Sequence, residues 1–512
     1  RQAYADVMAN INKRFGDLSL SANIGGSFTQ TYYDERGFQG GLKDMSNVFS
    51  LYNMTTTLDK DTYPIESGYK QRTNSIFASV EIGWKSMLYM TLTGRNDWDS
   101  ALINTEQSSF FYPSIGLSGV ISEMVKLPKA ITYLKVRGSF ASVGAPIPKN
   151  LSSNKTYEWD PATSQWKLQT YRPLPKLYPE RTNSWEAGLN AKFFNNSLSL
   201  EVTWYKANTR KQTFQVPLSG TAVYATMYAQ SGNIENKGME FSLGYNKSWG
   251  DFSWNSNLTF SFNKNKIVEL LDDAVDDEGN HYSLSEIDKG GIGSAKVILR
   301  KGGSMGDMYV TNRLKRDNEG NVYIDKASQN VKKEDIKNSD EFIHIGSVLP
   351  KSNLGFRNDF SYKGISLGFM LAARFGGIVI SPTQAVMDQF GVSKVTALAR
   401  DNEGVPVNNG KVDPQTYYTE VGGISGLMSN YVYSATNVRL QELSVGYSLP
   451  AKWFNNKCNL SLSITGHNLW MIYNKAPFDP EATASTGTYY QGVDYFMQPS
   501  LRSWGFNVKI QF

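Results

Sequence analysis

Residues 502–512 read Arg502-Ser-Trp-Gly-Phe-Asn-Val-Lys-Ile-Gln-Phe512. Every second side chain from Trp504 to Phe512 is apolar, and the side chains between them are small or polar. Successive side chains of a β-strand point to opposite faces, so this stretch predicts a strand with one apolar face and one polar face. A soluble sheet shows the same alternation, but the aromatic ends and the terminal Phe512 favour a strand of a membrane-spanning barrel.

The same alternation recurs upstream, in pairs of stretches joined by very short links. The apolar positions run from Ile76 to Trp84 and from Leu88 to Leu92, from Trp185 to Phe193 and from Leu198 to Trp204, and from Leu354 to Tyr362 and from Ile365 to Leu371. Two-residue links such as Asn195-Asn196 and Lys363-Gly364 are typical of tight hairpin turns. Counted over the whole chain, these patterns predict about fifteen strands.

Long polar segments separate the hairpins. They cover roughly 29–74, 96–110, 143–182, 209–235, 265–352, 376–435 and 471–500, and they are rich in Asp, Asn, Gly, Tyr and Ser. Short links on one side and long loops on the other are typical of outer-membrane barrels, with short periplasmic turns and long extracellular loops. A repeat fold such as a propeller would keep a fixed period, and these segments do not. The fold class predicted is all-β, a transmembrane antiparallel β-barrel.

The length and composition of the chain exclude several other classes of protein. A chain of 512 residues is too long for one compact soluble core. No long apolar run is present, and the mean hydropathy is -0.40, which argues against a helical membrane protein but not against a barrel. The net charge of +5 is nearly balanced, so we expect no nucleic-acid partner. The one cysteine, Cys458, excludes an internal disulfide.

The sequence offers no catalytic pattern. A small acidic cluster over 272–278 is interpreted as a solvated loop, with a bound cation or a partner contact as the alternative. The three histidines, His281, His344 and His467, lie far apart and lack the spacing of metal ligands. Three scattered histidines also suggest no Ser-His-Asp arrangement. We therefore expect no metal, no cofactor and no enzyme activity.

Aromatic residues in and beside the long segments are the candidates for binding. Aromatic faces stack on sugar rings or pack peptide side chains, while nearby carboxylates bind hydroxyls or amides. The candidate substrate-binding residues are Asp97, Trp98, Tyr112, Trp159, Tyr224, Tyr228, Tyr431, Tyr489 and Tyr490. The alternative is that these loops pack on themselves or on a partner. A second set, on the apolar face of predicted strands, is expected to form an aromatic membrane girdle: Trp84, Trp185, Trp204, Trp254, Trp504 and Phe512.

Six segments, taken in order, resemble a known family. They are Gly94-Arg-Asn-Asp97, Tyr178 to Leu189, Asn233 to Phe241, Asn437 to Tyr447, Gly466-His-Asn-Leu469 and Phe478-Asp-Pro-Glu481. Together they resemble the SusC/RagA family of TonB-dependent outer-membrane transporters. The resemblance implies a barrel of roughly 22 strands with a plugged lumen. On that basis residues 1–512 are expected to be the carboxy-terminal part of the barrel, with a plug domain and the first strands upstream of Arg1.

The resemblance also implies a function. It implies an outer-membrane importer of oligosaccharides or oligopeptides, surrounded by outer-membrane lipid. A SusD-like surface lipoprotein would act as its lid, and the TonB complex would act on the amino-terminal region. A dimer of transporter–lipoprotein pairs is possible. The alternatives are a passive outer-membrane porin and an outer-membrane hydrolase, the latter without a catalytic constellation to support it.

Overall fold

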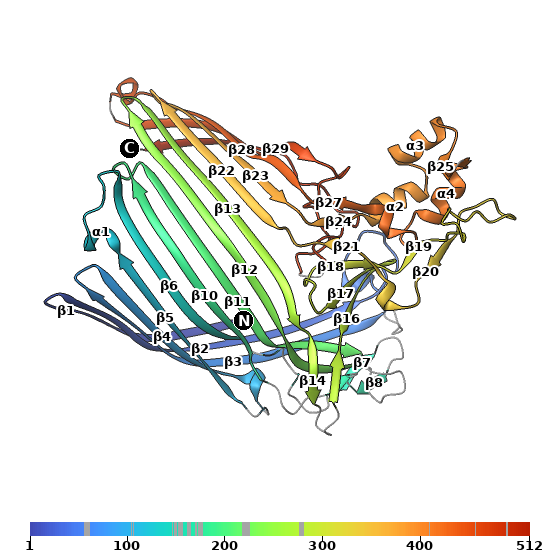
Figure 1. Ribbon diagram of the computed structural model, residues 1–512, viewed down its shortest axis with the longest axis horizontal. Helices are drawn as coiled ribbons and strands as arrows, with labels where there is room; N and C mark the ends of the chain where they lie inside the picture. The colour runs from blue at the N-terminus through green and yellow to red at the C-terminus, as the bar shows by residue number, and fades with distance from the viewer. Residues whose placement is uncertain are drawn as a thin grey trace.

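A computed structural model shows one antiparallel sheet that dominates the molecule (Figure 1). The structure describes residues 1–512 except 56–61, 104, 106, 146, 148–150, 152–156, 161–164, 169–170, 173–177, 218–225, 276–280, 409, 456, 488–489 and 512. Along the sheet, fifteen strands follow one another in hydrogen-bonded order, which confirms the predicted all-β class and strand number. We call these strands the wall.

The wall strands, in sheet order, have the following bounds: β1 (Gln2–Phe15), β2 (Leu18–Gln39), β3 (Tyr63–Trp84), β4 (Leu88–Asp99), β5 (Ser109–Val120), β6 (Ile131–Ala145), β10 (Glu180–Phe193), β11 (Leu198–Pro217), β12 (Thr226–Trp249), β13 (Phe252–Glu269), β22 (Ser352–Tyr362), β23 (Ile365–Phe375), β28 (Asn437–Ser448), β29 (Asn459–Asn474) and β30 (Ser503–Gln511). Most neighbours in this order are also neighbours in the chain, because short hairpins build the sheet.

Each wall strand carries an apolar face and a polar face, as the alternation predicts. Directly opposite residues of antiparallel strands share a face, and the register aligns Trp204 with Met239 and Met239 with Phe262. Large apolar side chains on this face are exposed rather than buried; Phe506, for example, is 68% exposed. Such a surface is stable where its surroundings are apolar.

The links at one end of the wall, the turn end, are short. Asn195 and Asn196 both have positive φ, at 55° and 66°, as the favoured two-residue hairpin turns require. The short helix α1 (Ile121–Met124) and the turn η5 (Ala451–Phe454) also lie at this end (Figure 1). No helix in the described ranges is long and apolar enough to cross a bilayer.

Within the described chain, the two edge strands of the wall pair on one side only. β1 pairs with β2, and β30 pairs with β29. Both edge strands are exposed over their whole described length. Over the described residues the wall is therefore an open, curved sheet whose two edges carry unpaired backbone groups (Figure 1).

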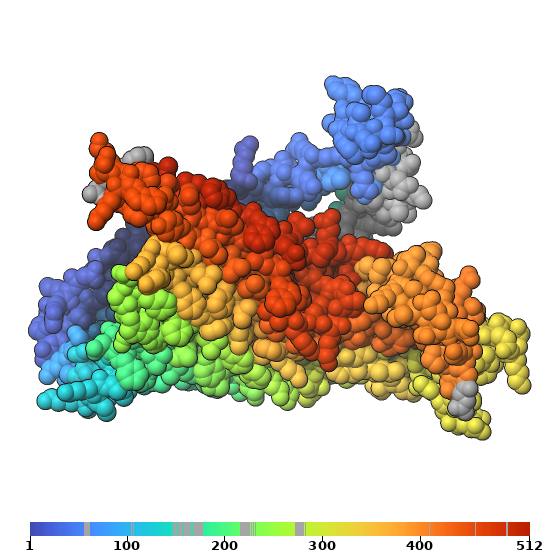
Figure 2. Space-filling model, turned by 90° about the horizontal axis from the view of Figure 1, so that it is seen from above, coloured from blue at the N-terminus to red at the C-terminus, as the bar shows by residue number. Residues whose placement is uncertain are grey.

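Two of the long segments at the other end, the loop end, fold into a compact body that we call the lobe. From the sequence we expect loops over 265–352 and 376–435, with strand-like stretches at 305–310 and 321–325 as the alternative. The structure instead shows a four-stranded sheet of β16 (Glu286–Ile292), β17 (Ala295–Arg300), β18 (Asp307–Val310) and β21 (Ile343–Ser347). The first of the two strand-like stretches contains β18. Three helices belong to it: α2 (Pro382–Gln389), α3 (Lys394–Asp401) and α4 (Pro414–Val421). Seen from above, the lobe, in yellow and orange, projects at one end of the wall (Figure 2).

The remaining elements are short and lie in the long segments. They are β7 (Tyr157–Asp160), β8 (Gln165–Leu168), β9 (Tyr171–Arg172), β14 (Leu271–Val275), β15 (His281–Leu284), β19 (Asn312–Leu314), β20 (Lys333–Asp335), β24 (Ile378–Ile380), β25 (Val405–Val407), β26 (Gly410–Val412), β27 (Val432–Ser434), η1 (Leu51–Asn53), η2 (Ser100–Leu102), η3 (Ser339–Glu341) and η4 (Met428–Tyr431).

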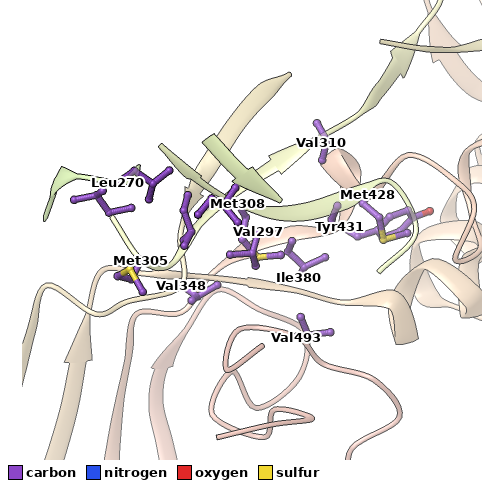
Figure 3. Close-up of a cluster of buried hydrophobic side chains, with 14 of the residues drawn as sticks. Leu270, Val297, Met305, Met308, Val310, Val348, Ile380, Met428, Tyr431 and Val493 are labelled. Atoms are coloured by element: carbon purple, nitrogen blue, oxygen red, sulfur yellow. The ribbon is translucent and has the colours of Figure 1, made fainter. Parts of the chain in front are cut away.

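The lobe has a hydrophobic core assembled from distant parts of the chain. Val297 and Met308 come from its sheet, Ile380 and Met428 from the segment between β23 and β28, and Val493 from the segment before β30 (Figure 3). Backbone hydrogen bonds from Ile380 N to Gly492 O and from Asp494 N to Ile380 O, both 2.8 Å, hold the last of these segments in place. The lobe is thus a tertiary assembly rather than a local motif.

The same core continues into the wall. Phe214, Ile234 and Ile267, near the loop ends of β11, β12 and β13, belong to it. Ile234 and Ile267 stand opposite each other and share the polar face of the wall. The lobe is therefore packed against the polar side of the wall, over its loop end.

Candidate functional site

A polar network lies on the polar face of the wall, close to the loop ends of β4 and β5. Arg95 Nε donates to Asp97 Oδ1 at 2.7 Å, and a second nitrogen of Arg95 donates to Ser75 Oγ at 2.7 Å. The Tyr112 hydroxyl donates to Asp97 Oδ2. Asp97 is buried, so its charge depends on these donors. Parts of Arg95 and Tyr112 remain exposed; Arg95 can offer N–H donors to a ligand, and the Tyr112 hydroxyl oxygen can accept.

A second buried carboxylate extends the network. Asp99 accepts from Thr73 Oγ1 at 2.6 Å and from Gln71 Nε2 at 3.2 Å, both on the neighbouring strand β3. It also caps the short helix η2 by accepting from Ala101 N at 2.8 Å. Since β3 and β4 are directly paired, these bonds fix the two carboxylates relative to the wall.

A small apolar cluster borders the network. Its buried members are Ala101, Leu102, Phe110, Ile147 and Leu151, and the rings of Tyr112 and Tyr228 pack against it. The Phe110 and Tyr112 rings are stacked, with centroids 5.6 Å apart. The structure thus brings together three predicted site residues, Asp97, Tyr112 and Tyr228, from separate strands. Carboxylate, phenol and apolar surface side by side suit a ligand with both polar and apolar faces.

A hollow of about 780 Å³ lies nearer the middle of the wall. Its charged lining is Arg137, Glu186, Glu201 and Glu240. Arg137 donates to Glu201 Oε1 at 3.1 Å and to Thr203 Oγ1 at 2.6 Å. We did not select these residues from the sequence, although the strand alternation alone places Glu201 and Thr203 on the polar face.

Other predicted site residues lie apart from this network. Trp98 is on the opposite face of β4 from Asp97, since it is its neighbour in an extended strand. Tyr431 is 2% exposed in the core of the lobe, so it does not reach the surface here. Tyr490 is partly exposed, and its hydroxyl donates to Lys289 O at 2.8 Å.

Three candidates can be placed only in part or not at all. The backbone of Trp159 lies in the hairpin of β7 and β8, opposite Trp166. Tyr224 and Tyr489 lie outside the described residues. Whether these three contact a ligand stays a prediction.

The predicted girdle residues occupy the apolar face of the wall. Trp84, Trp185, Trp204 and Trp504 are exposed there. Trp254 is half-buried among aromatic neighbours, and its Nε1 donates to Asn358 Oδ1 at 3.0 Å. Trp84 ends β3 beside the turn, whereas Trp185 and Trp204 lie farther toward the loop end. Phe512 lies outside the described residues.

The histidines do not assemble a site. His344 Nε2 lies 3.7 Å from Asp307 Oδ1, and His467 Nδ1 lies 3.9 Å from Glu442 Oε2. Over the part of the chain that the structure describes, no group of three His, Cys, Asp or Glu side chains is arranged to hold a metal ion.

Comparison with known proteins identifies the family. The family "TonB dependent receptor-like, beta-barrel" matches residues 2–297, more than half of the chain. The chain belongs to this family. Proteins of the TonB-dependent receptor family are outer-membrane barrels, and the chain is accordingly an outer-membrane barrel segment. By the usual asymmetry of such barrels, its turn end is periplasmic and its loop end extracellular.

Individual relatives lie in the same family. TonB-dependent receptor P3 of Formosa agariphila is 26% identical over 98% of this chain and 51% of its own length. TonB-dependent receptor SusC of Bacteroides thetaiotaomicron is 23% identical over 86% of this chain and 43% of its own length. The chain therefore spans about half the length of the curated relatives it matches.

A solved structure shares the fold. The RagAB peptide importer in its open-open state matches with a TM-score of 0.73 at 19% identity, over 99% of this chain and 54% of that one. The closed-closed state matches with the same TM-score over 56% of its chain. The predicted resemblance to SusC and RagA is confirmed.

Proposed function

We propose that the chain is the barrel portion of a TonB-dependent importer of SusC/RagA type. It takes up oligosaccharides or oligopeptides through the outer membrane. The observation that carries the proposal is the network of Arg95, Asp97 and Tyr112, because it offers a fixed polar contact surface on the polar face, near the extracellular end. Membership of the TonB-dependent receptor family and the likeness to SusC and RagA support the transport class.

The binding step is testable through the buried carboxylate. In the full-length protein, Asp97→Asn and Tyr112→Phe should each reduce ligand retention by about tenfold, because a hydrogen bond to a charged group contributes roughly 1.5–3 kcal/mol. Retention is measured by mass spectrometry after incubation with a tryptic casein digest or with a mixed plant-polysaccharide hydrolysate. The probe that is retained also names the ligand class.

The wall supplies a matched control for this test. On β22, Arg357 Nε donates to Asp359 Oδ2 at 2.9 Å, the same Arg-x-Asp arrangement as that of Arg95 and Asp97 but nearer the turn end. Asp359→Asn should leave retention unchanged. Equal ligand retention by the Asp97 and Asp359 variants would mean that the network takes no part in ligand binding.

We further propose that a SusD-like surface lipoprotein docks on the lobe. Support comes from an exposed apolar area on α3 and the link before it, formed by Phe390, Val392, Val395 and Leu398, of which Phe390 is 73% exposed. An apolar area of this kind on an extracellular body fits a protein partner. In the proposed mechanism, the partner closes over the ligand and the TonB complex then drives release into the periplasm.

Docking on the lobe can be tested without dismantling it. Deleting part of 376–435 should weaken lipoprotein association and leave the barrel inserted, but this segment also supplies Ile380 and Met428 to the core. The double change Phe390→Ser and Val392→Ser is more selective. It should lower co-purification of the lipoprotein, whereas Phe49→Ser and Tyr52→Ser, even more exposed in another loop, should not. Undiminished co-purification after the first pair would refute this docking face.

The open edges of the wall motivate a proposal on domain organisation. Unpaired backbone groups in lipid cost several kcal/mol each, and β1 and β30 each pair on one side only within the described chain. We propose that further strands of the same protein close the barrel to roughly 22 strands, and that a plug domain fills it. Mass spectrometry of the intact particle in mild detergent tests this, as well as a dimer of transporter–lipoprotein pairs.

A further inference from the structure

A strip of positive charge lies on the apolar side of the wall, beyond the aromatic band. Lys206 stands directly opposite Trp185 and Lys237, and Lys237 stands opposite Lys264. Directly opposite residues of antiparallel strands share a face, so these lysines are on the same face as the exposed Trp185. They lie toward the loop end, where the apolar positions stop.

Two arginines continue the strip on β10 and β11. Arg181 lies four residues from Trp185, hence on the same face, and its direct cross-strand partner is Arg210. Like charges directly opposite each other destabilise a sheet. The pairing of two arginines therefore suggests that a negative group is normally present between or above them.

Lys211 adds a third cation at this place. The ladder of β11 and β12 keeps its register from Arg210–Asn233 to Gln212–Ser231 but skips Lys211 and Gly232, which both have positive φ, at 56° and 91°. Lys211 Nζ lies 3.9 Å from the ring centroid of Tyr178. Arg181, Arg210 and Lys211 together line a pocket of about 260 Å³ with Gln107, Tyr178 and Asn183.

Neighbouring carboxylates do not neutralise these three cations. Glu235 forms ion pairs with Lys206 Nζ at 3.0 Å and Lys237 Nζ at 3.2 Å, and so neutralises lysines of the strip rather than these three cations. Among the described residues, Arg181 donates only to neutral acceptors, Ser142 Oγ at 3.4 Å and Phe111 O at 3.1 Å. Within the described ranges, no ion pair involves Arg181, Arg210 or Lys211. The pocket keeps its net positive charge.

The position of the pocket indicates which kind of anion it binds. Tryptophans on the apolar face mark the boundary between acyl chains and headgroups, and Arg181 lies just beyond Trp185 toward the extracellular side. A basic pocket at headgroup level binds anionic lipid headgroups. Arg181 and Arg210 offer planar donors suited to phosphate oxygens, and the amides of Asn183 and Gln107 can contact the attached sugar.

We propose that Arg181, Arg210 and Lys211 bind the phosphate of a phosphorylated glycolipid in the outer leaflet of the membrane. Its acyl chains pack against the apolar face beside Trp185. The site fixes the height of the barrel in the leaflet and is separate from the ligand network, which faces the other side of the wall. The inference rests on the outer-membrane location of the family and not on the proposed transport.

The test is a lipid titration of the full-length protein in mild detergent, followed by native mass spectrometry. The probes are diphosphorylated lipid A, the same lipid A with its phosphates removed, and inorganic phosphate. The test variant carries Arg181→Gln, Arg210→Gln and Lys211→Gln. The control variant carries Arg14→Gln, Lys247→Gln and Lys452→Gln, which removes three exposed cations at the turn end.

The expected result is a loss of about 100-fold in affinity for diphosphorylated lipid A in the test variant, because each cation at an anionic surface contributes roughly a fivefold factor. The control variant should bind as the wild type does, dephosphorylated lipid A should bind weakly to every variant, and inorganic phosphate should not displace the lipid. If the triple variant fails to fold, Arg210→Gln alone should lose about fivefold. Unchanged lipid binding in a folded variant, or displacement by inorganic phosphate at equal concentration, would overturn the proposal.

Discussion

The wall and the lobe use the same apolar residue types in opposite ways. In the lobe, Val297 and Met308 are buried in a core (Figure 3). In the wall, Phe506 and Ile510 are largely exposed. The difference shows that each region is folded for its own surroundings: the lobe excludes water from its interior, whereas the wall presents its apolar face to acyl chains. Average hydropathy hides this contrast because it counts apolar residues without regard to where they lie in the structure.

The largest expected effect comes from a substitution in the lobe core, which should destabilise the lobe and leave the wall intact. Val297→Asp places a carboxylate with no partner among fully buried side chains, and should destabilise the lobe by about 4 kcal/mol or more. The wall should remain inserted, since Val297 touches none of its apolar face. Limited proteolysis of the lobe, together with the heat-dependent gel mobility of the barrel, measures both. Val395→Asp, at an exposed position on α3, is the control and should have little effect.

A smaller effect is expected at a joint between the wall and the loop before β30. Arg439 on β28 is buried and binds Asp479 Oδ1 at 2.9 Å and Glu481 Oε2 at 3.0 Å. Arg439→Gln leaves a buried carboxylate without its cation and should cost about 3 kcal/mol locally. Hydrogen exchange over 475–500 should report the loss. Arg357→Gln, which breaks a more exposed pair, should change exchange little.

The stability of the same joint, between β28 and the loop before β30, should depend on pH. Burial alone would raise the pKa of Asp479, but hydrogen bonds from Ser500, the Glu481 backbone and Arg439 outweigh it and lower that pKa below the ordinary value. Stability from a carboxylate with a lowered pKa is fully present above the ordinary value of about 4 and is lost as pH falls through the folded value. Protection of 475–500 that stayed constant through this acid range would contradict the assignment.

An added charge should destabilise the wall on its apolar face but not on its polar face. Leu243→Arg places a charge on the apolar face of β12 and should cost about 2 kcal/mol, whereas Ser242→Arg, one residue away on the polar face, should cost little. Urea unfolding of the full-length protein in lipid vesicles measures the two costs. Equal costs would mean that the two faces of the wall meet the same surroundings.

The smallest effect concerns the lobe at alkaline pH. Burial, with the charge of Asp388 adding to it, raises the pKa of Tyr433 to about 12. A raised phenol pKa contributes stability that is full below the unfolded value of about 10 and is lost as pH rises through the folded value. The lobe should therefore loosen between these values before the wall does, as followed by proteolysis. Tyr433→Phe should lessen this dependence, and a wall that loosened first would contradict it.

The strands of the wall were predictable because their signal is local. A period of two residues and a two-residue turn are both visible within a short stretch, as from Trp185 through Asn195-Asn196 to Trp204. The lobe was not predictable in the same way. Its core joins Val297, Ile380 and Val493, which are far apart in the chain, and its strands are too short to show a period.

The candidate site was predictable in its parts but not in its assembly. Residue type alone suggested Asp97, Tyr112 and Tyr228, yet only the structure brings them together: the register pairs β4 with β5, and the small apolar cluster packs Tyr228 beside Tyr112. Trp98 could have been separated from Asp97 by alternation alone, because neighbours in a strand face opposite ways. Tyr431 could not, since its burial depends on packing between distant segments.

What the sequence by itself determined is the wall: its strands, its hairpins and the apolar face that marks it as membrane-facing. These depend on the alternation of side chains along an extended chain. That alternation is visible in the sequence without knowledge of any distant contact. The tertiary structure alone decided the lobe core, the network around Asp97 and the facing of Arg181 with Arg210. These depend on register and on loop packing, where small differences in buried area and in charge pairing choose among many alternatives that the sequence leaves open.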